Sequence, residues 1–146
     1  MIKDLLENFE FDIVQTPLNL IDRRFVEGNY HKLFKDLDVE IHVRSVFMQG
    51  LLLMTRAQMP KYFNKWDFIW RRWHAWLFEH SARSLDTCLA FALSYPEVDQ
   101  IIVGADSFQQ WESIINSARA DLKVSFPSIG VNDFSLINPS NWPLKK

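Results

Sequence analysis

The chain has 146 residues, of which 48% are hydrophobic and 23% charged, a composition that fits one soluble globular domain with a real core. Its net charge of −2 lacks the basic excess typical of nucleic-acid-binding proteins. Apolar runs such as residues 51–54 are too short to cross a bilayer, and the N-terminus lacks the apolar segment of a signal peptide. We therefore expect a cytoplasmic protein that binds neither nucleic acid nor membrane.

The first elements predicted along the chain are a short helix over residues 2–8 and a strand over residues 11–18. Pro17 should end the hydrogen-bonding ladder of that strand or lie at its rim. A second helix is expected over residues 30–37, where Leu33, Phe34 and Leu37 recur at helical spacing.

The next stretch, DVEIHVRSVFMQGLLLM, begins as a strand with two unlike faces. Val39, Ile41 and Val43 alternate with Glu40, His42 and Arg44, and residues 45–50 then interrupt the pattern with a glycine-containing loop. Two arrangements explain a charged face. The strand either lines the interior of a β/α barrel near an active-site mouth, or it belongs to an antiparallel sheet with one wet face.

Residues 60–95 predict two helices, the first with an aromatic face and the second with Ser84 as its N-cap. The single cysteine, Cys88, lies in the second helix and is expected to be a buried, inert thiol. The aromatic face is typical of core packing, with a partner interface as the alternative. It consists of Phe63, Trp66, Ile69, Trp70, Trp73, Trp76 and Leu77. His74 and His80 are six residues apart, which does not suit paired metal ligands, and we predict no metal site.

The last part predicts a short apolar strand over residues 100–104 and an amphipathic helix over residues 107–120. Ser107 and Gln110 have the spacing of a capping box at its start. From residue 121 onward the chain is predicted to be irregular and packed on a surface. Strands that alternate with helices favour parallel β/α units, and the helical segments on both sides of the charged strand favour the barrel.

Four segments of the chain resemble the C-terminal half of the aldo/keto reductases, in the order and spacing of that family. They are DIVQTPLNLIDRRF, EIHVRSVFMQGLLL, VDQIIVGADSFQQWESII and LINPSNW. The match covers residues 2–142 and is greatest with the bacterial branch often found near surface-polysaccharide genes.

The resemblance implies one domain over residues 1–146 that forms part of a (β/α)8 barrel, with three parallel strands corresponding to strands 6–8 of the family. Aldo/keto reductases reduce carbonyls with NADPH or NADH. The family's catalytic Asp, Tyr, Lys and His lie in the preceding half, so the resemblance assigns no catalytic residue here. Tyr30, Lys35, His31 and His42 are not in those motifs.

What the resemblance does assign is part of the site for the nicotinamide dinucleotide, NADP or NAD. Gln15 matches the glutamine that binds the nicotinamide carboxamide, RSVFMQG matches the loop that cradles the pyrophosphate, and GADSFQQWESI matches the segment that holds the adenosine phosphate. The implied cofactor-binding residues are Gln15, Arg44, Ser45, Phe47, Gln49, Gly50, Gly104, Asp106, Ser107 and Gln110.

Two departures from the family bear on the cofactor. Related enzymes often carry Arg or Lys in the last loop to pair with a 2′-phosphate, whereas position 106 is Asp, and their adenine-contacting Asn is Ile114 here. Purely structural roles are also open. Ser107 and Gln110 could serve only as a helix cap, and Gly50 and Gly104 only as turn residues.

Two functions remain open. The chain is expected to be an aldo/keto reductase fragment or split-gene product, inactive alone because the catalytic half is missing. Alternatively it is a non-catalytic half-barrel that self-associates or binds a partner. Three parallel strands leave unpaired edges, so a homo-oligomer or a chain supplying the N-terminal half-barrel is expected in both cases.

Overall fold

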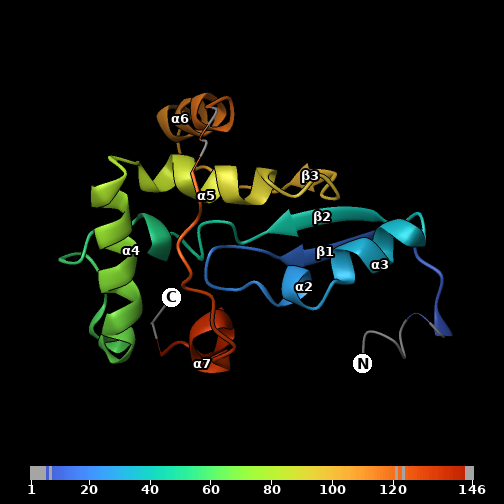
Figure 1. The fold of residues 1–146 in the computed structure, drawn as a ribbon, viewed down its shortest axis with the longest axis horizontal. Coiled ribbons are helices and arrows are strands. Elements are labelled where there is room, and N and C mark those ends of the chain that lie inside the picture. The colour runs from blue at the N-terminus through green and yellow to red at the C-terminus, as the bar shows by residue number, and fades with distance from the viewer. Residues whose placement is uncertain (1–5, 7, 121, 123, 144–146) are drawn as a thin grey trace.

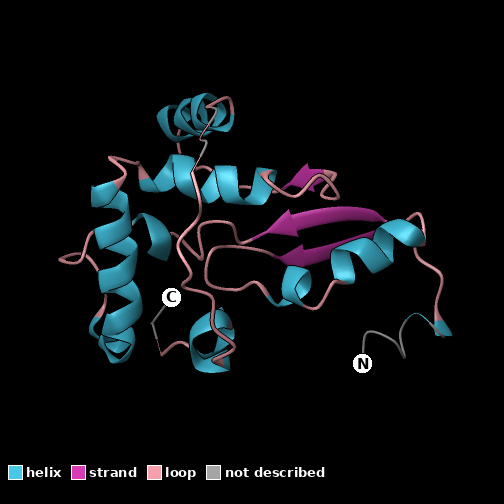
Figure 2. Ribbon diagram, viewed as in Figure 1, coloured by secondary structure: helices cyan, strands magenta, loops and turns pink. Residues whose placement is uncertain are grey.

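A three-stranded parallel sheet forms the centre of the computed structural model, which describes residues 6, 8–120, 122 and 124–143 (Figures 1 and 2). The strands β1 (Ile13–Pro17), β2 (Glu40–Arg44) and β3 (Gln100–Ile101) adjoin in that order, and both pairs are parallel. The sheet is open, so the predicted partial barrel is confirmed and the antiparallel alternative is wrong. The helix predicted over residues 2–8 lies, apart from residues 6 and 8, outside the described residues.

Two helices connect β1 to β2. The short helix α2 (Arg24–Glu27), which the sequence pattern did not predict, precedes the predicted α3 (Tyr30–Asp36). Phe25 of α2 stacks on Phe34 of α3, with ring centroids 5.9 Å apart. These aromatic rings join the same core as β2, whose apolar side chains Ile41 and Val43 are fully buried, so this face of the sheet is covered.

The connection from β2 to β3 contains the predicted pair of longer helices. Its elements are the 3-10 helices η1 (Leu51–Leu53) and η2 (Lys61–Trp66), and the α-helices α4 (Asp67–Glu79) and α5 (Ser84–Leu93). Trp66, Trp70 and Trp73 are buried, which confirms that the aromatic face packs in the core. The predicted cap is wrong, because Arg83 is the N-cap of α5 and Ser84 is its first helical residue.

The C-terminal part carries the predicted amphipathic helix, α6 (Phe108–Ala118), followed by a tail that is less irregular than expected. Within the tail, α7 (Phe134–Ile137) and the 3-10 helix η3 (Pro139–Asn141) are ordered turns. The tail also contributes buried side chains, because Ile129, Leu136 and Ile137 are at most 5% exposed. It is therefore part of the core and not a surface covering alone.

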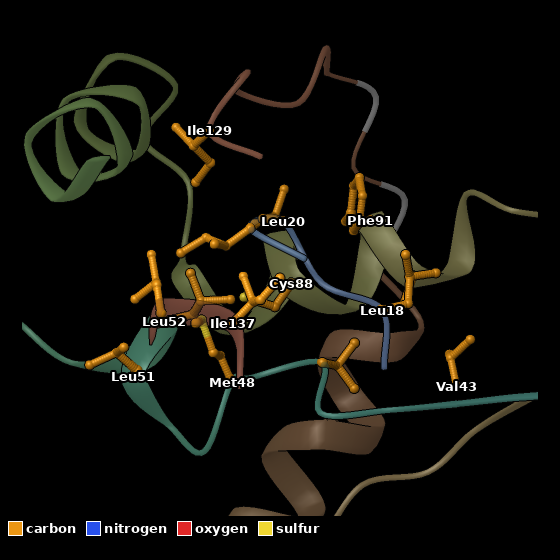
Figure 3. Packing of buried hydrophobic residues seen from close by; sticks show 14 of the residues in the cluster. Leu18, Leu20, Val43, Met48, Leu51, Leu52, Cys88, Phe91, Ile129 and Ile137 are labelled. Carbon is orange, nitrogen blue, oxygen red and sulfur yellow. The ribbon is translucent and has the colours of Figure 1, made fainter. Parts of the chain in front are cut away.

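The core lies where β2, the segment after it, α5 and the tail converge (Figure 3). Figure 3 labels ten of its side chains: Leu18, Leu20, Val43, Met48, Leu51, Leu52, Cys88, Phe91, Ile129 and Ile137. Cys88 is buried, as predicted, and this burial raises the pKa of its thiol. None of the described helices is long and apolar enough to span a membrane.

Among the described residues, the second face of the sheet is partly exposed and neither edge has a further strand. Ile13 and Ile102 are 51% and 39% exposed, and they lie on the face opposite to Ile41 and Val43 by strand alternation and register. Within the described part of the chain, β1 and β3 each pair only with β2. In a barrel this face would point inward and both edges would be paired.

Candidate functional site

A cleft of about 680 Å³ lies between the segments that follow β2 and β3. One wall is the loop of residues 45–50, here called the 45–50 loop, and the other is formed by residues 102–106 and the first half of α6. Its lining residues are Ser45, Val46, Phe47, Gln49, Gly50, Leu53, Leu85, Ile102, Val103, Gly104, Asp106, Gln109, Gln110, Ser113 and Ile114. Because both strands are parallel, the cleft lies at their carboxyl ends, where parallel β/α folds place their binding sites.

The 45–50 loop has an unusual backbone conformation. Three of its non-glycine residues, Ser45, Met48 and Gln49, have positive φ angles of 60°, 50° and 55°, and Gly50 follows at 80°. A non-glycine residue in this region costs about 1 kcal/mol or more, so surrounding contacts must hold the shape. Asn19 supplies one of them, because its side-chain amide donates to the Ser45 carbonyl oxygen at 3.1 Å.

The core supplies a second anchor for the same loop. The Met48 side chain is buried, and its backbone N–H donates to the Ser45 carbonyl at 2.9 Å. The Leu52 N–H closes the other end by donating to the Phe47 carbonyl at 3.2 Å. The loop shape is therefore fixed from the protein interior.

Several backbone N–H groups of this loop have no acceptor in the described part of the chain. Among the described residues, none accepts a hydrogen bond from the N–H of Val46, Phe47, Gln49 or Gly50. Backbone N–H groups that go unpaired require an acceptor from water or a ligand. A run of such groups on one loop suits an anion, because they act together as partial positive charges.

The start of α6 forms the second wall of the cleft, and hydrogen bonds within this segment fix its shape. The Ser107 hydroxyl accepts from the Gln110 N–H at 3.2 Å, which confirms the predicted cap. The side-chain oxygen of Gln110 accepts a hydrogen bond from the N–H of Asp106 at 2.8 Å. In the usual capping box it would accept from the N–H of the N-cap residue, Ser107, one position later. This helix end directs its positive dipole toward the same space as the 45–50 loop.

Seven of the ten residues that the sequence assigned to a cofactor line the cleft together. They are Ser45, Phe47, Gln49, Gly50, Gly104, Asp106 and Gln110. The positive φ of Gly50 shows a conformational need for glycine, whereas Gly104 has no such angle and an added Cβ would meet nothing within 4 Å.

The other three assigned residues lie outside the lining. Ser107 caps α6, and Arg44 is exposed at the end of β2, where its guanidinium donates to the Ser45 hydroxyl at 3.3 Å. Gln15 lies within β1, opposite His42, and is exposed on the open face of the sheet.

Sequence reasoning missed two polar residues of the cleft, Gln109 and Ser113 on α6. They follow Asp106 by three and seven positions, a spacing that places side chains on one helix face. The signal was therefore present, because polar residues recur at helical spacing on that face.

The charged strand residues form a small cluster on the open face. The Nε2 atom of His42 lies 2.7 Å from Oε1 of Glu40, and the Gln100 side-chain amide donates to the same oxygen at 3.1 Å. The polar residues that alternate with apolar ones in β2 therefore form hydrogen bonds with one another on the open face of the sheet. Across the described residues, no group of three or more His, Cys, Asp or Glu side chains is placed to hold a metal ion.

These features define a class of fold, an incomplete (β/α) barrel with its cleft at the carboxyl ends of the strands. No family model and no curated protein matches the sequence. Solved structures do match. The holo form of aldo-keto reductase AKR11C1 from Bacillus halodurans aligns with a TM-score of 0.65 and 18% identity over 87% of this chain, and the apo form with 0.66 and 18% over 85%.

The alignment covers only 43% of the reductase chain in both cases. The chain therefore spans less than half the length of the proteins that it resembles. At this identity the likeness establishes the fold, which is that of part of an aldo/keto reductase barrel.

Proposed function

We propose that this chain is the C-terminal, dinucleotide-binding part of an aldo/keto reductase barrel and that its cleft holds a nicotinamide dinucleotide. The observation that carries the proposal is the convergence of the 45–50 loop and the start of α6 on one cleft. Its volume of about 680 Å³ lies within the usual range for cofactor sites. The likeness to a reductase that is itself described as a holo form supports the same assignment.

The residues of the cleft fit the chemical groups of such a cofactor. The unpaired N–H groups of the 45–50 loop can donate to pyrophosphate oxygens, and Arg44 adds a positive charge beside them. The start of α6 would hold the adenosine end, and Gln15 on the open sheet face would bind the nicotinamide carboxamide. When bound, the nicotinamide ring supplies the hydride chemistry, and the protein positions the ring.

Catalysis requires groups that the resemblance places in the remainder of the barrel. The parent reaction is hydride transfer between a nicotinamide cofactor and a carbonyl or an alcohol, and it needs a positioned proton donor. We propose that the same polypeptide or another supplies that donor with the missing strands. The chain of residues 1–146 by itself should therefore show no reductase activity.

Calorimetric titration with NADH and NADPH tests the cofactor site directly. The chain should bind at least one of the two saturably, and Ser113→Trp, which places an indole in the cleft, should weaken that binding at least about tenfold. Glu112→Trp is the matched control, because its neighbouring position on α6 is exposed and outside the lining, and it should leave the affinity unchanged. Absence of saturable heat with both nucleotides would refute the proposal.

A second candidate function, a half-barrel that self-associates or binds a partner, is favoured by a different observation. The open face carries the exposed Ile13 and Ile102, and both sheet edges within the described residues lack a neighbouring strand. Such edges pair readily with another chain. Sedimentation of the chain should show a homo-oligomer or a complex with a polypeptide that contributes the missing strands, and Ile13→Lys should weaken it. A monomer at all concentrations, with no such complex, would count against this candidate.

A further inference from the structure

We propose that one side of α6 is a dimer interface, at which α6 of a second copy of this chain packs antiparallel about a two-fold axis beside Ile115. This interface is independent of the dinucleotide site, because its residues do not line the cleft. It is also separate from the open face of the sheet. In Figure 1, α6 lies at the edge of the molecule, beyond α5.

Apolar side chains run along α6 on the side away from the cleft. They recur at intervals of three and four residues, which places them on one face of the helix. The two aromatic ones, Phe108 and Trp111, are 73% and 47% exposed. Exposed apolar surface of this extent on one helix face is typical of a contact with another protein. These residues, here called the α6 stripe, are Phe108, Trp111, Ile115 and Ala118.

The α6 stripe continues into an apolar groove between α5 and α6. This groove has a volume of about 330 Å³, and three of the four stripe residues line it together with side chains of α5 and β3. Leu93, which belongs to the α5 wall of the groove, is 51% exposed. The apolar surface therefore extends beyond a single helix and offers a second copy a wider contact.

The size of the stripe residues decreases along α6, and this order favours an antiparallel second copy. Both aromatic rings precede Ile115, and the small Ala118 follows it. If Ile115 of both copies lies at the axis, Trp111 of each copy meets Ala118 of the other, since these residues are four positions before and three after the centre. A large side chain against a small one allows close packing, whereas a parallel pair would place ring against ring.

Two charges beside the α6 stripe follow the same symmetry. Glu112 lies on α6 and Arg119 is its C-cap residue, and both are exposed. Neither forms an ion pair with another described residue. They are seven positions apart, and so on the same side of the helix.

An antiparallel pair brings these opposite charges together. Glu112 of each copy then faces Arg119 of the other, which gives two ion pairs at the rim of the contact. In a parallel pair each charge would face its own kind. The surface of α6 is therefore complementary to itself in both size and charge, as an interface about a two-fold axis requires.

Sedimentation equilibrium of the chain over a wide concentration range tests this interface. The chain should pass from monomer to dimer with a dissociation constant in the micromolar range, because the contact is smaller than a standard interface. Trp111→Glu should raise that constant at least about tenfold, since it places a charge in the centre of the contact. Phe78→Glu is the matched control, because it makes the same kind of change on α4 at a residue that is 86% exposed, and it should leave dimerisation unchanged.

Exchange of the two charges tests the antiparallel geometry without altering the apolar contact. Glu112→Arg alone and Arg119→Glu alone should each weaken the dimer about tenfold at low ionic strength, because like charges then face each other at two places. The double variant should recover the original affinity to within about twofold, because each pair is again of opposite sign. Circular dichroism of every variant verifies that the helices are retained.

The outcomes separate this interface from the other proposals. A monomer at all concentrations would overturn it, and so would a dimer that Ile13→Lys weakens and Trp111→Glu does not, since the open sheet face would then form the contact. Failure of the double charge variant to recover the affinity would overturn the antiparallel arrangement. None of these results bears on the dinucleotide site, which the NADH and NADPH titrations test separately.

Discussion

Replacing Trp73 with Phe should destabilise the fold by about 3 kcal/mol. Trp73 on α4 is fully buried, and its indole N–H donates to the Leu52 carbonyl at 3.1 Å. Leu52 is part of η1, which directly follows the 45–50 loop. This single bond therefore joins the long helix to the segment that supports the cleft.

The magnitude has two parts. Loss of the buried pyrrole portion of the indole, with the small cavity that remains, costs about 2 kcal/mol. The Leu52 carbonyl is left without its donor in the interior, which adds about 1 kcal/mol. The ring stack on Trp76, with centroids 6.2 Å apart, is retained in part because Phe keeps a six-membered ring.

Urea unfolding followed by far-ultraviolet circular dichroism measures the effect. With a slope of about 2 kcal/mol per molar urea, the midpoint should fall by about 1.5 M. Trp76→Phe on the same helix is the control, since that residue is half-buried and its indole has no acceptor among the described residues, and it should lose only about 1 kcal/mol. Equal losses for the two variants would show that the buried hydrogen bond to Leu52 does not contribute as argued.

Three further predictions concern other parts of the chain. The hydrogen bond from the Ile41 N–H and the contact with Lys35 lower the pKa of Asp99 in the folded chain. The ionised Asp99 carboxylate therefore stabilises the fold fully above about pH 4, and this contribution is lost as the pH falls through the folded-state pKa. Acid unfolding should therefore be less steep in Asp99→Asn, and an identical profile would contradict the assignment. Ser107→Ala should cost about 1 kcal/mol by removing the cap of α6, seen as a fall in Tm of about 2–4 °C, whereas an unchanged Tm would argue against the cap. Cys88 should react with Ellman's reagent only after unfolding, because burial raises its thiol pKa; rapid reaction of the native chain would mean that the thiol is accessible.

Periodicity was sufficient to predict the elements that are regular over several turns or that alternate clearly. The strand over Glu40–Arg44 alternates buried and more exposed residues, and α6 has both an apolar face and a cap that depends only on residues three apart. The parallel order followed from the helices between the strands. These features are local, so the sequence expresses them directly.

The errors occur where distant contacts decide the structure. The tail was predicted to be irregular, yet the Trp142 indole donates to the Leu136 carbonyl and the Trp66 indole donates to the Asp133 carboxylate, contacts that order α7 and bury its apolar side. The helix α2 has only four residues, too few for a periodic signal. Ser84 resembles a cap by type, but the chain enters the helix one residue earlier.

The candidate site was predicted in part for the same reason. Residues of the 45–50 loop and the start of α6 were singled out from the sequence, while their shared cleft depends on how β2 and β3 bring the two segments together. The positive φ angles at Met48 and Gln49 could not be predicted, because those residue types rarely adopt them without support from the surrounding structure.

A nuclear magnetic resonance titration of the ¹⁵N-labelled chain with ADP-ribose, followed at the backbone amides, tests the proposed dinucleotide site most directly. We expect saturable shifts concentrated at the unpaired N–H groups of Val46, Phe47, Gln49 and Gly50 and at the first turn of α6, with α4 unaffected. Absence of shifts, or shifts spread over surfaces remote from the cleft, would contradict a dinucleotide site in this part of the barrel.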